Sequence, residues 1–246
     1  MTVLVTGSGD PVTVVAHGLG ATIAETRAVA GGVTGTKVFP EARAHGSAPL
    51  PEQPGYQELA AALLAVADQH DATSAFGVSM GAHTLLRILS QHPTRFRRVV
   101  LFLPATIDNP VRRTPALADA FASGDRERLL SAIRGELGVG GPAVEAYAAA
   151  RVEFMRSCPG LPGLIAGLAG DTAMVDRTAL SAVTAEVLVI GQEGDALHPA
   201  GVSRELAAAL PRARLMIFDR PGAAFVDRQR LRSAVSEHLT TGLRGI

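Results

Sequence analysis

The sequence predicts a doubly wound α/β fold, with a mostly parallel sheet between layers of helices. Two features of the chain indicate this fold. Short apolar runs bounded by Gly, Pro or charged residues are typical of strands buried in a parallel sheet, and longer segments with helical periodicity lie between them. Because the two kinds of segment alternate along the chain, we expect parallel strands joined by crossover helices.

The expected elements follow in chain order. The clearest strands are at residues 12–16, 99–103, 187–190 and 215–218, and weaker ones are at 37–40 and 73–77. The helical patterns between them are at residues 56–70, 80–92, 199–210 and 227–239. A chain of 246 residues with this single alternating pattern predicts one domain over residues 1–246.

Residues 105–184 interrupt the alternation with Ala-rich helical segments, so we expect a helical lid inserted between two strands. The lid carries more large apolar side chains than solvent-exposed helices need. We therefore expect it to line an apolar pocket for a small or medium apolar substrate. The helical segments are at 115–122, 126–137 and 144–155, and the apolar residues are Phe121, Leu129, Ile133, Phe154, Met155 and Leu164.

The composition of the chain indicates which classes of partner are not expected. With 47% hydrophobic and 19% charged residues, the chain has the composition of a folded globular protein. Lys plus Arg (23) balance Asp plus Glu (23), so no net charge draws the chain to nucleic acid or to an anionic membrane. No signal-like or membrane-spanning run is present, which favours a cytoplasmic location. The single Cys158 is expected to be a packing residue, and the oligomeric state is left open.

The sequence Gly-Val-Ser-Met-Gly at residues 77–81 matches the Gly-x-Ser-x-Gly pattern of a nucleophile elbow. It stands directly after an expected strand and directly before an expected helix, which is the context that the elbow requires. Glycines flank the serine because strand and helix must pass close together at a strained turn. The pattern therefore predicts that the hydroxyl of Ser79 is presented at the carboxyl edge of the sheet.

Here the sequence resembles the α/β-hydrolase family over most of the chain outside the lid. The run His-Gly-Leu-Gly at residues 17–20, after a strand, looks like the family's oxyanion loop. By that match the oxyanion donors are the backbone N–H groups of Leu19 and Met80, and His17 and Gly18 lie beside the substrate. The loop at residues 41–47 is similar to the family's Arg-Gly-His-Gly-x-Ser loop, with Ala44 replacing the first glycine, and supports the fold alone.

The sequence has a match for the family's catalytic acid but none for its histidine in the usual loop. The strand and loop at residues 187–195 resemble those that present the family's acid, which makes Asp195 the acid candidate. The family's histidine normally follows the last strand, but there this chain has Ala224 and Phe225 in place of Gly-His. Phenylalanine cannot accept a proton, so Phe225 is expected only to contact substrate. Without an imidazole base, Ser79 would be a poor nucleophile.

His198 is the best candidate for a relocated base, because it lies in the same loop as Asp195. Three alternatives stay open: His198 acts as base, another histidine does, or the protein has no serine–histidine chemistry. The other six histidines have structural explanations, as helix ends (His70 and His92), as packed residues of helices (His83 and His238) or as residues that shape the loops (His17 and His45).

Other classes of function have little sequence support. The run Val-Thr-Gly-Ser-Gly at residues 5–9 suggests a dinucleotide site, but no helix opens on its glycines, and we expect a hairpin turn there instead. No phosphate-binding or metal-binding motif occurs, so neither a cofactor nor a metal is expected. The sequence thus predicts an enzyme that hydrolyses an ester, thioester or lactone through Ser79. The alternative is a lyase, cyclase or ligand-binding protein with an incomplete triad.

Overall fold

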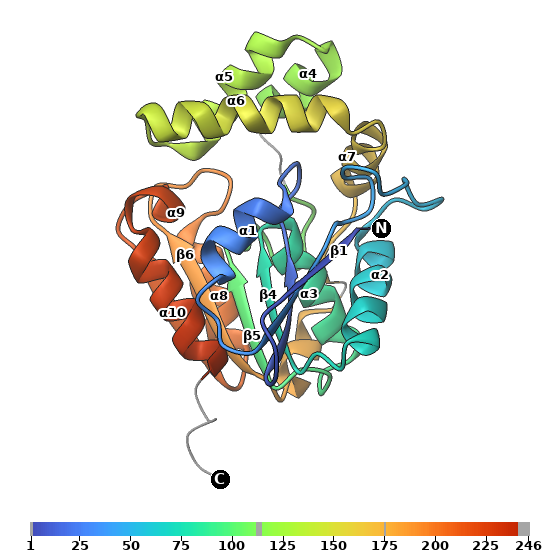
Figure 1. The fold of residues 1–246 in the computed structure, drawn as a ribbon, viewed down its shortest axis with the longest axis vertical. Coiled ribbons are helices and arrows are strands. Elements are labelled where there is room, and N and C mark those ends of the chain that lie inside the picture. Colours follow the sequence, from blue (N-terminus) through green and yellow to red (C-terminus); the bar gives the residue numbers. More distant parts are fainter. Residues whose placement is uncertain (1, 112–114, 175, 241–246) are drawn as a thin grey trace.

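The computed structural model describes residues 2–111, 115–174 and 176–240 (Figure 1). Within these residues, seven strands form one sheet in the order β1-β3-β2-β4-β5-β6-β7. All neighbouring strands are parallel except β1, which runs antiparallel to β3. The strands are β1 Val3–Thr6, β2 Val12–Ala16, β3 Thr36–Pro40, β4 Ser74–Val78, β5 Arg98–Phe102, β6 Glu186–Gln192 and β7 Ala213–Phe218.

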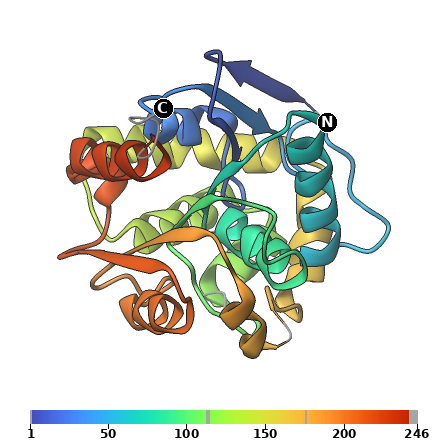
Figure 2. The ribbon, with the colours of Figure 1, turned by 90° about the horizontal axis from the view of Figure 1, so that it is seen from below.

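Helices cover both faces of this sheet, as the alternating pattern predicted. Figure 2 shows α1 and α10 together on one face, and α3 and α8 on the other. The central strands read as unbroken apolar runs because both of their faces are buried: Val99, Val100 and Leu101 are fully enclosed. The covering helices are α1 Ile23–Ala30, α2 Tyr56–Gln69, α3 Met80–Gln91, α8 Ala200–Ala209, α9 Ala223–Val226 and α10 Arg228–Thr240.

The expected hairpin near the N-terminus is wrong. Strands β1 and β2 are not neighbours, because β3 lies between them and pairs with both. Val38 of β3 faces Val5 on one side and Val14 on the other. The crossover through α1, a helix that the sequence patterns missed, carries the chain from β2 to β3, and β3 takes the place beside β1 that β2 would have in a hairpin.

A second layer of helices lies over the carboxyl edge of the sheet (Figure 1). These helices, which we call the cap, form an apolar cluster of their own that includes Leu129, Ile133, Val152 and Met155 and also takes in Met80 of α3. The cap helices are α4 Pro115–Ser123, α5 Arg126–Leu137, α6 Pro142–Ser157 and α7 Leu161–Ala169.

The predicted insertion does not behave as one unit over its whole length. Its last part, which includes the short 3-10 helix Arg177–Ala182, returns to the main core, where Met174 and Leu180 are buried among residues of the sheet and of α3 and α8. Among the described residues of the predicted insertion, those at 115–169 form the cap. Within the described part of the chain, no helix is long and apolar enough to cross a membrane.

Candidate active site

Ser79 occupies a strained turn between β4 and α3. Its backbone has φ +50° and ψ −110°, a conformation that a residue with a side chain rarely adopts. The flanking glycines make the turn possible: a Cβ atom on Gly81 would lie 2.3 Å from the carbonyl oxygen of Ala16, and one on Gly77 would lie 2.5 Å from the carbonyl oxygen of Gly81. The geometry is therefore that of the predicted nucleophile elbow.

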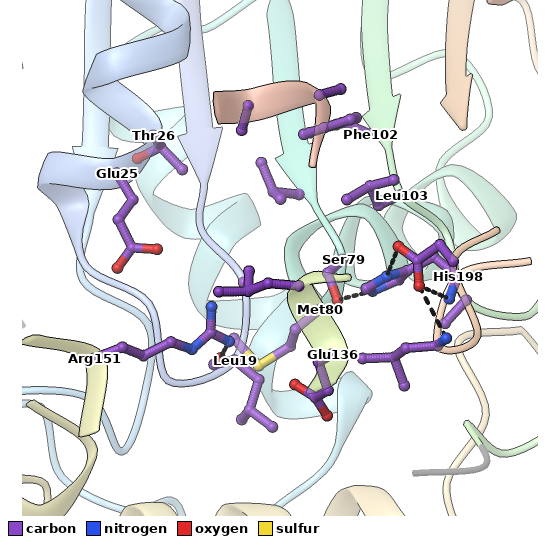
Figure 3. A pocket seen from close by; sticks show the side chains of 18 of the residues that line it. Leu19, Glu25, Thr26, Ser79, Met80, Phe102, Leu103, Glu136, Arg151 and His198 are labelled. Carbon is purple, nitrogen blue, oxygen red and sulfur yellow. Dashed lines mark hydrogen bonds and ion pairs between the residues drawn. The ribbon is translucent and has the colours of Figure 1, made fainter. Parts of the chain in front are cut away.

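His198 lies within hydrogen-bond reach of this serine. The Oγ of Ser79 is 2.9 Å from the Nε2 of His198, which is in the loop between β6 and α8 (Figure 3). The side chain of His198 is 11% exposed, so little water competes for this contact. The two side chains are 119 residues apart in sequence, and the carboxyl edge of the parallel sheet brings them together.

Asp195 orients the imidazole from its other side. The Nδ1 of His198 donates to Oδ2 of Asp195 at 3.0 Å, while Oδ1 accepts the backbone N–H groups of Leu197 and His198 at 2.9 Å each. A proton on Nδ1 leaves the lone pair of Nε2 directed at Ser79, the tautomer that a general base needs. Burial disfavours the carboxylate, but the hydrogen bonds and charge of His198, with help from Gln192, outweigh it and lower the pKa of Asp195 to about 2.

Gln192, the last residue of β6, is a partner of Asp195 that the sequence patterns did not reveal. Its Nε2 donates to Oδ2 of Asp195 at 2.7 Å, and its Oε1 accepts the N–H of Ala223 at 3.2 Å. The side chain is 4% exposed and uses both ends of its amide. It therefore connects the loop of the acid to α9, where the family's histidine would be.

The two residues expected to supply oxyanion donors, Leu19 and Met80, line the same cavity as Ser79. Met80 is the first residue of α3, so its N–H has no acceptor within the helix. The carbonyl oxygen of Gly18 faces the other way, toward Nδ1 of His17 at 2.8 Å and the N–H of Ala21 at 3.2 Å. Because a trans peptide directs its C=O and N–H in opposite directions, this contact turns the N–H of Leu19 away from His17. Leu19, Ser79 and Met80 all line the same cavity.

That cavity encloses about 420 Å³ between the sheet edge and the cap, and most of its wall is apolar. Of the residues expected to contact substrate, Gly18 and Phe225 line it, whereas His17 lies behind the oxyanion loop and does not. Phe225 packs edge-on against the ring of Tyr147, with ring centroids 5.1 Å apart. The cap contributes two polar residues to the wall, Tyr147 and Arg151, which no sequence motif had marked.

Known structures share this architecture over nearly the whole chain. An enol-lactonase from Burkholderia xenovorans superposes with a TM-score of 0.82 at 20% identity, covering 97% of this chain and 95% of that one. The chain has the α/β-hydrolase fold. An esterase from Exiguobacterium antarcticum (TM-score 0.80, 18% identity, 96% and 94% covered) and a meta-cleavage product hydrolase from Pseudomonas fluorescens (0.78, 18%, 96% and 92%) are similar too. No family model matches the sequence, and no curated protein does.

Two further histidines near the site, His17 and His45, have both ring nitrogens in hydrogen-bond contact. His17 contacts Gly18 and also accepts the N–H of Ala42 at 3.0 Å. His45 contacts the carbonyl of Arg43 through Nδ1 and accepts the N–H of Gly20 at 2.8 Å through Nε2. Burial lowers the pKa of His17, and it lowers the pKa of His45 to about 3. Both rings therefore hold loops in the neutral form.

His83 lines the cavity but is turned toward the protein. Its Nδ1 lies 2.9 Å from the hydroxyl of Tyr56, and its Nε2 accepts the N–H groups of Ala105 and Thr106 at 3.0 and 3.3 Å. Burial lowers the pKa of His83 to about 3. Since both nitrogens are occupied, this imidazole has no lone pair to offer Ser79.

Proposed function

We propose that this protein is a serine hydrolase that cleaves an ester, thioester or lactone of a small or medium apolar substrate. The observation that carries the proposal is the continuous hydrogen-bonded chain from Ser79 through His198 to Asp195, with distances of 2.9 and 3.0 Å. The three side chains are thus close enough for proton transfer from Ser79 to His198, although His198 lies in a different loop from the histidine of the α/β-hydrolases that the sequence resembles.

The reaction proceeds in two halves. His198 takes the hydroxyl proton at Nε2 while Oγ of Ser79 attacks the substrate carbonyl carbon. The N–H groups of Leu19 and Met80 stabilise the negative charge on the carbonyl oxygen. As the tetrahedral intermediate collapses, the bond to the alcohol or thiol breaks, and that leaving group takes the proton from Nε2. A water molecule, deprotonated by Nε2 of His198, then attacks the acyl carbon. The bond from that carbon to Oγ breaks, Oγ of Ser79 takes the proton back from Nε2, and the carboxylic acid is released.

Asp195 supports both halves without itself transferring a proton. Because its pKa is about 2, the carboxylate stays charged through the neutral range and stabilises the imidazolium that forms on His198. The apolar wall of the cavity favours a hydrocarbon acyl group, and its volume of about 420 Å³ suits a small or medium one.

The proposal is tested by a fluorophosphonate probe followed by intact-mass measurement. We expect one adduct on the unmodified protein and none on Ser79→Ala, while His92→Ala, which alters an exposed histidine, labels normally. The acyl preference is measured with p-nitrophenyl esters of increasing chain length. Absence of labelling and of ester turnover would overturn hydrolysis and favour a lyase, cyclase or binding protein. Indifference to chain length would contradict an apolar acyl site.

A further inference from the structure

A polar cluster lies at the junction of the cap and the oxyanion loop. Tyr147 and Arg151, one helical turn apart on α6, face Glu25 on α1, and all three line the cavity. The hydroxyl of Tyr147 donates to Glu25 at 2.6 Å, and the guanidinium of Arg151 donates to the hydroxyl of Tyr147. Glu25 also caps α1 by accepting the N–H of Thr22 at 2.9 Å.

Arg151 then reaches the oxyanion loop itself. Its Nη2 donates to the backbone carbonyl oxygen of Leu19 at 2.6 Å, a contact between residues 132 positions apart (Figure 3). Burial opposes the charge of Arg151, but the neighbouring Tyr147 and Glu25 outweigh it and raise its pKa. The cation is therefore permanent, and charge-assisted bonds of this kind are stronger than neutral ones.

This contact completes the restraint of Leu19. The peptide unit between Leu19 and Gly20 is held at both ends, its C=O by Arg151 and its N–H by His45. The preceding peptide unit is held by the contact of His17 with the carbonyl oxygen of Gly18. The N–H of Leu19 lies in the preceding plane, whose carbonyl contacts His17, and this plane is joined at the Cα of Leu19 to the plane held at both ends. The contacts on both sides of Leu19 therefore restrict the direction in which its N–H points. Of the three side chains that hold these two peptide units, His17, His45 and Arg151, the one from the cap is Arg151.

We propose that Arg151 is a positioning residue that makes the oxyanion hole depend on a seated cap. When α6 is in place, the Leu19–Gly20 peptide is held and the N–H of Leu19 is aimed at the developing oxyanion. When the cap moves away, that peptide loses the bond to its carbonyl. This inference rests on the proposed hydrolysis at Ser79. It adds that a residue of the cap positions part of the proposed catalytic machinery, beyond enclosing the substrate.

The test separates kcat from KM for ester hydrolysis. In Arg151→Met, we expect kcat to fall about 10- to 100-fold with KM changed less than about 3-fold, because a loosened donor costs less than the 10²- to 10³-fold typical of a deleted one. Arg151→Lys, which keeps a cation able to reach one acceptor, should recover part of kcat. Tyr147→Phe should lower kcat less than Arg151→Met. Arg134→Met is the matched control, since Arg134 forms an exposed pair with Glu145 on the cap surface.

Hydrogen exchange of the loop gives a readout that needs no activity. Peptides covering residues 17–24 should exchange faster in Arg151→Met than in the unmodified protein, while peptides from α6 and the thermal midpoint stay close to those of the Arg134→Met control.

An unchanged kcat with unchanged loop exchange in Arg151→Met would overturn the positioning role, as would a rise in KM alone, which would make Arg151 a substrate-binding residue. Failure of the unmodified protein to react with the fluorophosphonate would overturn the proposed function instead. The two failures are thus distinguishable.

Discussion

The loops after β6 and β7 leave neighbouring strands at the same edge of the sheet, yet they contribute different groups to the site. The first carries Asp195 and His198, which form the hydrogen-bonded chain to Ser79. The second, where the resemblance to α/β-hydrolases places a histidine, carries Phe225, whose ring packs on Tyr147. The difference teaches that reach to the serine, and not the order of residues along the chain, decides which loop can supply the base.

Backbone groups help to hold Asp195 in this compact loop. The carboxylate of Asp195, three residues before His198, accepts two backbone N–H groups through one oxygen and the N–H of the imidazole through the other. The tight turn that these bonds stabilise points the ring at Ser79. The contact with Ala223 lets Gln192 connect the two loops even though only one of them supplies proposed catalytic residues.

The largest expected effect comes from removing the proposed base. His198→Ala should lower kcat/KM by about 10⁴- to 10⁶-fold, as loss of a triad member does, because Ser79 would keep its proton. The thermal midpoint should change little, since Asp195 keeps the two backbone N–H groups and Gln192. Steady-state ester hydrolysis and thermal denaturation measure the two quantities, with His92→Ala as the control. Activity within about 10-fold of the unmodified protein would show that the base lies elsewhere.

A double variant sharpens the comparison of the loops. In His198→Ala with Phe225→His, a histidine returns to the customary loop while the relocated one is lost. We expect kcat/KM to stay as low as in His198→Ala, because the side chain at position 225 packs on Tyr147. In addition, Gln192 already donates a hydrogen bond to Asp195 from that side. A kcat/KM more than about 10-fold above that of His198→Ala alone would mean that a histidine in the second loop can also reach Ser79.

A smaller effect concerns the histidines that cannot replace the base. Burial holds the pKa values of His45 and His83 at about 3, against about 6.5 in an unfolded chain. Between these values the unfolded state binds more protons, so the free energy of unfolding decreases as the pH falls below about 6.5 and is insensitive to these groups above it. We expect a loss of about 1 kcal/mol per histidine per pH unit below pH 6.

Urea unfolding at pH 7, 6 and 5 measures this loss. His83→Gln should show a shallower dependence on pH, because one buried imidazole has been removed, and His92→Ala should keep the original slope. A stability that does not change over this range would show that His45 and His83 are able to take up protons in the folded state. His83 would then become a rival to His198.

The smallest effect is expected at the link between the two loops. Gln192→Leu keeps the volume of the side chain approximately but leaves the N–H of Ala223 without its acceptor and removes one donor from Asp195. We expect a loss of about 1–2 kcal/mol in the free energy of unfolding and a fall in kcat of about 10-fold or less. Urea unfolding and ester turnover provide the measurements. If neither the free energy of unfolding nor kcat changes, the backbone contacts of Asp195 hold its carboxylate without help from Gln192.

The features predictable from sequence were those that local patterns encode. The apolar runs predicted the buried strands, and the glycines around Ser79 predicted a turn that the structure contains. The placement of His198 beside Asp195 made it a candidate, and the structure brings it to the serine. Whether these residues catalyse a reaction stays a prediction that the proposed experiments test.

Features that depend on contacts between distant segments were missed. The side of β3 on which β1 pairs is set by the α1 crossover, and local alternation suggested a hairpin instead. Gln192 and Arg151 carry no motif, because their roles arise from what packs beside them: the carboxylate of Asp195 in one case and the carbonyl of Leu19 in the other. Neither partner can be identified from sequence spacing alone.

The short distance along the chain between Asp195 and His198 also bears on which parts of the protein can be substituted. The proposed reacting side chains all lie between residues 79 and 198, so β7, α9 and α10 contribute packing and part of the cavity wall. Their buried residues, such as Phe218, Leu231 and Val235, must fit the sheet, but they transfer no proton. Substitutions in this C-terminal segment that preserve its packing and the contact of Ala223 with Gln192 are therefore expected to change the cavity wall at Phe225 without altering the proposed catalytic residues.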